Sequence, residues 1–173
     1  NRDTWPFFGW RSFAFTDQLD VVNRLYRDLL DAEGRYPDSG RVNPSKPTLA
    51  ELRTPQEPPG RRYLRGQDWR APKEIGHTLD QRLGVSRTTS YDSGVSTASE
   101  VVVATAALEV GFDDEAVGLV LQHKAPRDMA SFLQRKGRAG RTRHTRPWTV
   151  VVLSDYGRDR MAYQAYEQLF DPE

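Results

Sequence analysis

A short basic segment in the last third of the sequence carries the side chains best suited to chemistry. It reads Gln134-Arg135-Lys136-Gly137-Arg138-Ala139-Gly140-Arg141. Guanidinium groups are planar, permanently charged forks that match phosphate oxygens, and glycines let the backbone approach a ligand closely. The segment therefore indicates a phosphate-binding site, useful where the charge of a γ-phosphate develops during reaction.

Apolar runs that alternate with amphipathic stretches predict the elements that position this segment. Strands are expected at 11–16, 85–90, 101–105, 117–121 and 148–153, and helices at 17–33, 71–83, from Pro126 onward and at 158–170. Thr16 or Asp17 is the expected N-cap of the first helix, and Gly34 its terminator. Strands buried on both faces and joined by helices predict an α/β fold with a mainly parallel central sheet.

Residues 35–69 interrupt this pattern with a run of prolines and glycines. Proline fixes φ and donates no backbone N–H, so neither a helix nor a central strand can continue through the run. We interpret 35–69 as an insertion or long surface loop within a single domain that spans residues 1–173. A solvated loop is favoured over a partner-binding segment for this stretch.

Composition narrows the class of protein. The chain has 173 residues and no cysteine, which excludes disulfides and thiolate zinc sites. It contains no apolar run near the roughly 20 residues that a membrane-spanning helix needs, so we expect no membrane partner and a cytoplasmic location. The first and last residues suggest a piece of a longer protein. The three histidines are too widely spaced to suggest a metal site, and we predict none.

The basic segment resembles motif VI of superfamily 2 helicases, written as His or Gln followed by Arg-x-Gly-Arg-x-Gly-Arg. Every fixed position matches, and the preceding residues 119–126 resemble the strand and Pro turn that come before this motif. The resemblance implies that Arg138 and Arg141 are arginine fingers that reach ATP on the opposite lobe. It also implies that Gln134 and Arg135 connect that site with motif residues of the partner lobe.

Two further segments share this resemblance. Residues 103–113, with Ala104-Thr105 and Gly111-Phe112-Asp113, resemble motif V. By position, Thr105 and Gly111 are expected to contact the nucleic-acid backbone, and Asp113 the ATP ribose or the arginine-finger loop. The strand Ser12–Thr16 resembles motif IV, in which a hydroxyl meets a phosphate, although Thr16 could equally be a simple helix cap.

The middle of the chain departs from the family pattern. The Pro-rich insertion replaces a short connection, and Ser90-Tyr91-Asp92-Ser93-Gly94-Val95 stands where a His-Gly pair and a Gln/Arg-containing helix are usual. Nucleic-acid contacts normally made there are assigned to no residue. The Asp114-Glu115 pair is interpreted as a solvated turn, not as a magnesium-binding box, because no Gly-x-x-x-x-Gly-Lys-Ser/Thr phosphate loop occurs in the chain.

Together the motifs imply the C-terminal, second RecA-like domain of a DEAD/DEAH-type superfamily 2 helicase from a larger bacterial protein. Such a domain is a three-layer α/β/α lobe related to P-loop NTPases. ATP and Mg²⁺ would be held mainly by an N-terminal RecA-like lobe of the same polypeptide, with DNA or RNA as the other partner. The isolated lobe lacks the Walker A and B motifs and is expected to be inactive alone.

Other functions fit parts of the sequence. Arginine-glycine runs also occur in disordered RNA-binding tails, although a helix and a strand flank this run. A RecA-like lobe without a motor partner could act as a non-catalytic module that binds nucleic acid or protein. A double-strand translocase or nucleosome remodeller would carry the same motifs.

Overall fold

A computed structural model describes residues 8–46, 82–89, 95–105 and 113–167 of the chain. The described residues fall into two compact units. One holds those between 27 and 83, and the other holds those before 27 and from 84 onward. All five strands and all described motif residues belong to the second unit, so the site is built within it.

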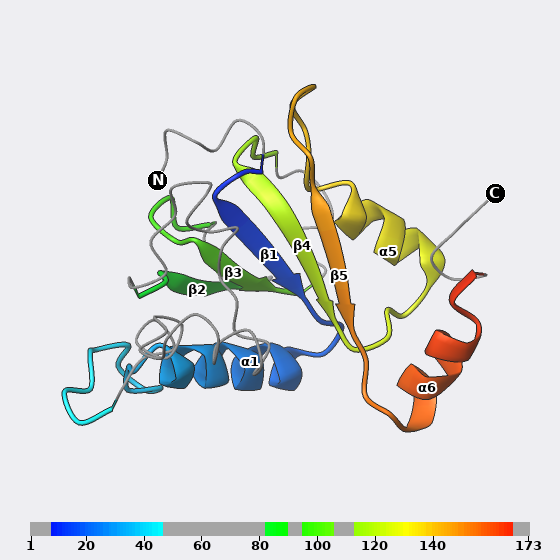
Figure 1. The fold of residues 1–173 in the computed structure, drawn as a ribbon. Helices are drawn as coiled ribbons and strands as arrows, with labels where there is room; N and C mark the ends of the chain where they lie inside the picture. Colours follow the sequence, from blue (N-terminus) through cyan, green and yellow to red (C-terminus); the bar gives the residue numbers. More distant parts are fainter. Residues whose placement is uncertain (1–7, 47–81, 90–94, 106–112, 168–173) are drawn as a thin grey trace, which may run out of the picture. The chain divides into compact units, whose positions relative to one another are not determined.

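The second unit contains a five-stranded sheet in which every pair of neighbours is parallel. The strands are β1 (Arg11–Phe15), β2 (Val85–Thr88), β3 (Val101–Ala104), β4 (Val117–His123) and β5 (Trp148–Val152), in the spatial order β2-β3-β1-β4-β5 (Figure 1). A described helix follows each of β1, β4 and β5 along the chain. The predicted α/β class with a parallel sheet is therefore confirmed.

The central strand β1 defines the topology. Phe13 stands opposite Val102 of β3 on one side and Val120 of β4 on the other. After β1 the chain continues toward the β2 edge, whereas after β4 it continues toward the β5 edge. Such a reversal between neighbouring parallel strands is a topological switch point, the usual location of ligands in open α/β sheets.

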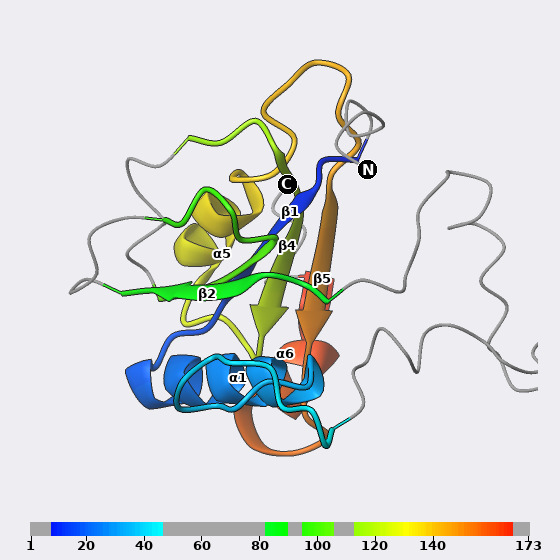
Figure 2. The ribbon, with the colours of Figure 1, turned by 90° about the vertical axis from the view of Figure 1, so that its left-hand side faces the viewer.

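The hydrophobic core lies on the face of the sheet that helix α5 (Met129–Lys136) covers (Figure 2). Two phenylalanines of β1, Phe13 and Phe15, meet edge to face with ring centroids 6.1 Å apart. Their partners in the cluster are Val102, Ala104, Val117, Val120 and Ala139. Ala139 comes from the basic segment itself, so the core fixes that segment to the sheet.

Helix α1 (Leu19–Ala32) ends as predicted at Gly34. Gly34 has φ 65°, its N–H binds the Asp31 carbonyl, and the N–H of Arg35 binds the Leu30 carbonyl. This paired pattern is the Schellman motif, which needs a left-handed residue. The predicted N-cap is wrong by one or two residues, because the helix begins at Leu19 and Asp17 instead forms an ion pair with Arg135.

Two further expectations need correction. The helix after β4 begins at Met129 rather than at Pro126, because the Asp128 carboxylate accepts the Ser131 N–H at 2.8 Å and caps it. Strand β5 was expected to be buried, yet Trp148, Val150 and Val152 are 63%, 38% and 45% exposed. As the last strand in the order, β5 has one neighbour, and no described residue buries that face.

The first part of the predicted insertion has defined hydrogen bonds without a helix or a strand. Residues 36–41 form a turn in which the Tyr36 N–H binds the Arg41 carbonyl at 2.8 Å. Residues 47–81, with the rest of the insertion and most of the helix predicted at 71–83, lie outside the described residues. Helix α6 (Gly157–Gln164) matches the first part of the helix predicted at 158–170, and residues 168–170 also lie outside them. No described helix has the length and apolar character to cross a membrane.

Candidate functional site

The basic segment leaves helix α5 at Gly137 and turns back toward the start of β4. The Gly137 N–H binds the Leu133 carbonyl at 2.9 Å, and the Gly140 N–H binds the Val117 carbonyl at 3.1 Å. Gly140 has φ 71°, and a Cβ there would lie 2.5 Å from Cγ of Pro147. Only glycine fits at 140, whereas Gly137 has φ −68° and does not require it.

The two predicted arginine fingers lie on this turn, at the amino ends of the strands. Arg138 is half-buried and Arg141 is exposed. The Arg141 guanidinium lies 3.6 Å from the Asp113 carboxylate, which precedes β4. The structure thus brings together one residue from each of the two segments that resemble motifs V and VI. Both groups remain open to solvent, 40% and 71% exposed, and therefore accessible to a ligand.

Asp114, next to Asp113, is not a solvated turn residue as expected. Its side chain is 15% exposed and forms an ion pair with Arg11, which is itself 6% exposed. Its second carboxylate oxygen accepts the Ala116 N–H at 2.8 Å. Arg11 also donates to the Ser99 carbonyl at 3.0 Å and the Thr97 carbonyl at 2.7 Å. This network holds the start of β4, and with it Asp113, in place.

Arg135 occupies a different position from the one implied by the resemblance. It is 2% exposed and is one of the largest fully buried side chains. Its guanidinium donates to Oε1 of Gln122 at 2.8 Å, forms an ion pair with Asp17, and lies 5.6 Å from the Phe15 ring centroid. Arg135 is therefore used inside this lobe, whereas its neighbour Gln134 is exposed on α5.

The predicted nucleic-acid contacts lie at the opposite edge of the sheet. Thr16 follows β1, and its N–H binds the Ala104 carbonyl at 3.1 Å. Thr105 follows β3, so the two threonines are neighbours at the carboxyl ends of adjacent strands. Thr16 is 2% exposed and Thr105 half-buried. Gly111 lies outside the described residues. The seven residues of β4 separate the two edges by roughly 20 Å.

Sequence reasoning missed the polar residues that join α5 to the carboxyl edge. Gln122 lies within an apolar strand yet is 0% exposed, and its Nε2 donates to the Lys124 carbonyl at 3.0 Å. A buried amide requires hydrogen-bond partners, so Gln122 was the one signal that a buried polar contact existed. Nothing in the sequence identifies Asp17 as the partner of Arg135, because 118 positions separate them.

Asp159, at the start of α6, accepts hydrogen bonds from residues that follow β4 and β5, at the carboxyl ends of the strands. Burial raises the pKa of its carboxyl, but hydrogen bonds from the Ser154 hydroxyl and from the backbone amides of Ala125 and Ser154, with the charge of Lys124, outweigh it. The pKa is therefore lowered from its ordinary value of 3.8. Within the described part of the chain, no group of three or more His, Cys, Asp or Glu side chains could hold a metal ion.

Comparisons with known proteins bear on these motifs. Residues 79–143 match the family described as "Helicase conserved C-terminal domain". That segment extends from before β2 to just past the basic segment, and so includes the two segments that resemble motifs V and VI. No curated protein matches the chain in sequence.

Solved helicase structures resemble the chain at low identity. The helicase Lhr of Mycobacterium smegmatis, bound to ssDNA and AMP-PNP, is 22% identical with a TM-score of 0.49 over 95% of this chain and 18% of Lhr. The DUF1998 helicase MrfA, bound to DNA, is 17% identical with a TM-score of 0.47 over 94% of this chain and 17% of MrfA. The C-terminal domain of the DEAD-box protein Dbp5 is 16% identical, with a TM-score of 0.47 over 95% of this chain and 71% of that one.

The chain thus spans less than a fifth of the length of Lhr and of MrfA. TM-scores below 0.5 establish no common fold, and the family match covers residues 79–143 of the 173-residue chain. Residues 79–143 are thus similar to a helicase C-terminal domain, and the described strands of this part of the chain belong to a parallel sheet.

Proposed function

We propose that this domain is the second motor lobe of an ATP-dependent, DEAD/DEAH-type helicase or translocase. The observation that carries the proposal is the turn at the amino ends of the strands, where Arg141 lies 3.6 Å from Asp113 and the Gly140 N–H binds β4. Because the backbone of this turn is hydrogen-bonded to the sheet, Arg138 and Arg141 are held in position before a ligand binds. Charged groups positioned in advance stabilise the charge that develops in a transition state.

In this proposal, ATP and Mg²⁺ are bound mainly by an N-terminal RecA-like lobe of the same polypeptide. Closure of the two lobes brings Arg138 and Arg141 to the γ-phosphate, where their guanidinium groups balance the charge of the transition state. Asp113 holds Arg141 in place before closure and is available to the ribose. The exposed Gln134 faces the partner lobe, and Arg135 acts indirectly, by fixing α5 to β1 and β4.

DNA or RNA is bound at the other edge, by Thr16, Thr105 and Gly111. Contacts to a nucleic-acid backbone give binding that is sensitive to salt and largely independent of sequence. Because the two ligands meet opposite ends of one rigid sheet, closure around ATP moves the nucleic-acid edge as well. Alternating closure and opening would then convert ATP hydrolysis into movement along the strand.

The test is nucleic-acid-stimulated ATP hydrolysis by the complete polypeptide that contains this lobe. Arg138→Ala and Arg141→Ala should each lower kcat by a factor on the order of 10³, the lower end for arginine fingers. Arg143→Ala is the matched control, because Arg143 is exposed on the same loop but lies outside the motif. Equal hydrolysis by the wild type and by a folded Arg138→Ala variant would disprove the finger assignment.

The same assays separate this function from its alternatives. A non-catalytic binding module would retain nucleic-acid affinity but show no ATP hydrolysis in the complete polypeptide. Strand separation and movement along an intact duplex distinguish a helicase from a double-strand translocase. The isolated 173-residue lobe should show no turnover, because the γ-phosphate site is completed by the other lobe.

A further inference from the structure

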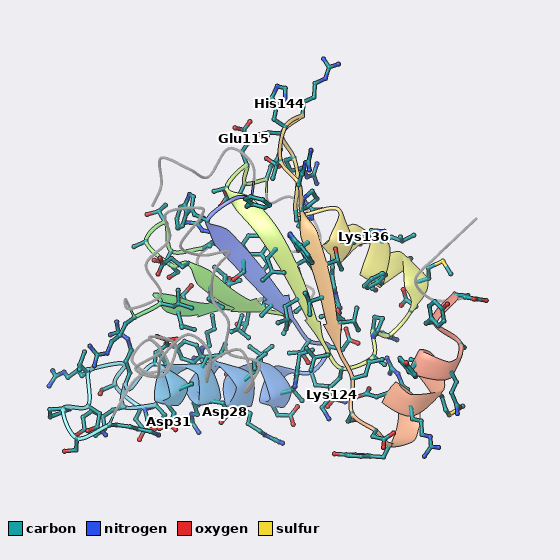
Figure 3. All side chains as sticks on the ribbon, viewed as in Figure 1. Asp28, Asp31, Glu115, Lys124, Lys136 and His144 are labelled. Carbon is teal, nitrogen blue, oxygen red and sulfur yellow. The ribbon has the colours of Figure 1, made fainter. Side chains whose placement is uncertain are left out.

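A pocket of about 250 Å³ lies at the topological switch point, and none of the contacts proposed for ATP uses it. It opens between the residues that follow β1 (Thr16–Gln18 and Val21), those at the end of β4 (His123–Ala125) and the start of α6 (Arg158 and Asp159). Figure 3 places Lys124 at this end of the strands, and Glu115 and His144 at the opposite end. The pocket is therefore on the nucleic-acid edge, far from Arg141.

The carboxylates of the pocket are already used within the domain. Asp17 pairs with Arg135 and lies 3.8 Å from Arg158. Asp159 accepts the Ala125 and Ser154 N–H groups, each at 2.9 Å, and the Ser154 hydroxyl at 2.6 Å. Asp17 and Asp159 therefore both stabilise the fold through contacts within the domain. A ligand could bind in the pocket without breaking these contacts.

The two cations of the pocket, Lys124 and Arg158, have fewer partners within the domain. The ammonium of Lys124 has no carboxylate within 4.0 Å among the residues that the structure describes. Arg158 donates to the carbonyls of Ala125, at 2.8 Å, and Pro126, and its side chain is 59% exposed. Two cations and two carboxylates line the pocket, and Arg135, which does not line it, pairs with Asp17 from within the core, so the cations in and next to the pocket outnumber the carboxylates by one. The balance of one positive charge favours an anionic ligand.

Lys124 also has an unusual backbone. Its φ of 70° is the only positive value of a non-glycine residue in the described parts of the chain. The conformation is held by the Lys124 N–H, which binds the Val152 carbonyl at 2.8 Å, and by Gln122, which binds the Lys124 carbonyl. A lysine with a positive φ has a higher backbone free energy than a glycine would have there. Residues with this kind of backbone strain are found most often at functional sites.

We propose that Lys124 and Arg158 form a phosphodiester-binding site at the switch point. It extends the nucleic-acid track from Thr105 and Thr16 to a third strand end, and so rests on the proposed function. The ends of β3, β1 and β4 follow one another across about 10 Å, two strand spacings, so one short stretch of backbone could contact all three. Because phosphodiesters are common to DNA and RNA, this site does not select between them.

The test measures binding of single-stranded oligonucleotides to the complete polypeptide by fluorescence anisotropy, over a series of salt concentrations. Lys124→Gln should weaken binding about fourfold at 0.15 M salt and reduce the slope of log K against log salt by about 0.7, the value for one phosphate contact. Arg143→Gln is the control for loss of one cation, because Arg143 is exposed, lies outside the basic segment and is next to His144, which Figure 3 places at the opposite end of the strands from Lys124.

A second variant separates binding from folding. Lys124→Gly relieves the strained φ, so it should unfold at no lower urea concentration than the wild type and yet lose the same affinity as Lys124→Gln. Wild-type affinity and slope in both Lys124 variants would overturn the proposal. So would inorganic phosphate that binds in a Lys124-dependent manner while oligonucleotide affinity stays unchanged, because the site would then serve a free anion.

The two proposals fail in different ways. If the wild-type polypeptide binds oligonucleotides and hydrolyses ATP but Lys124→Gln binds like the wild type, the pocket assignment alone is wrong. If the wild-type polypeptide neither binds nucleic acid nor hydrolyses ATP, the motor function is wrong, and the phosphodiester site is overturned with it.

Discussion

The guanidinium of Arg135 pairs with the carboxylate of Asp17 at the end of β1, although Arg135 belongs to the same basic segment as Arg138 and Arg141. Side chains on a helix lean toward its N-terminus, and α5 begins at the carboxyl edge of the sheet. Arg135 therefore reaches back toward that edge, while the residues after Gly137 leave at the other. One continuous segment thus contacts both edges of the lobe.

This division predicts unequal effects of arginine substitutions on stability. Arg135→Ala should lower the free energy of unfolding by about 3 to 5 kcal/mol, the cost of breaking a buried, hydrogen-bonded ion pair. Arg141→Ala should lower it by less than about 1 kcal/mol, because its partner Asp113 is exposed. Urea denaturation of the 173-residue chain measures both, and similar losses in the two variants would contradict the inward position of Arg135.

The two glycines of the basic segment should also differ. Gly140→Ala places a methyl group against Pro147 at a left-handed φ, which should cost about 1 to 3 kcal/mol. Gly137→Ala has an allowed φ, and its Cβ would lie 3.3 Å from the Leu133 carbonyl oxygen. We expect it to change stability by less than about 1 kcal/mol in either direction. Thermal unfolding of the two variants side by side tests the comparison.

Asp113 should matter more for activity than for folding. The exposed ion pair of Asp113 with Arg141 contributes about 0 to 1 kcal/mol at most, so Asp113→Asn should unfold nearly like the wild type. In the complete polypeptide, the same variant should hydrolyse ATP about tenfold more slowly, because about 1.4 kcal/mol of transition-state stabilisation corresponds to that factor. Steady-state kinetics measure this rate. An unchanged kcat/KM for ATP in Asp113→Asn would show that Asp113 does not belong to the ATP site.

Acid should weaken the carboxyl edge through Asp159. Because its folded-state pKa is lowered, its contribution to stability is complete above the ordinary pKa of 3.8 and is lost as pH falls through the lower folded-state value. Unfolding by urea, followed between pH 5 and about pH 2, should show a larger acid loss for the wild type than for Asp159→Asn. Parallel stability curves would show that the hydrogen bonds to Asp159 do not depend on its charge.

Much of the fold could be predicted from the sequence, because apolar periodicity reports local burial. The strand runs at 101–105 and 117–121 were found within two residues of β3 and β4. Gly34 ended α1 as expected, since few residues other than glycine adopt its φ. The predictions of burial were wrong where burial depends on packing against a neighbouring part of the fold. The run at 148–153 is a strand as predicted, but whether it is buried depends on what covers it.

The site followed the same division. The residue types and spacing of 134–141 predict a phosphate-binding site, and this stays a prediction. The pairing of Arg141 with Asp113 and the choice of Arg135 as the buried arginine came only from tertiary structure. These depend on which face of α5 packs against the sheet and on residues more than a hundred positions away. Local sequence determines that the guanidinium groups of Arg135, Arg138 and Arg141 can each bind phosphate. The packing of α5 against distant strands determines that Arg135 is buried, and that Arg138 and Arg141 stay available for a ligand.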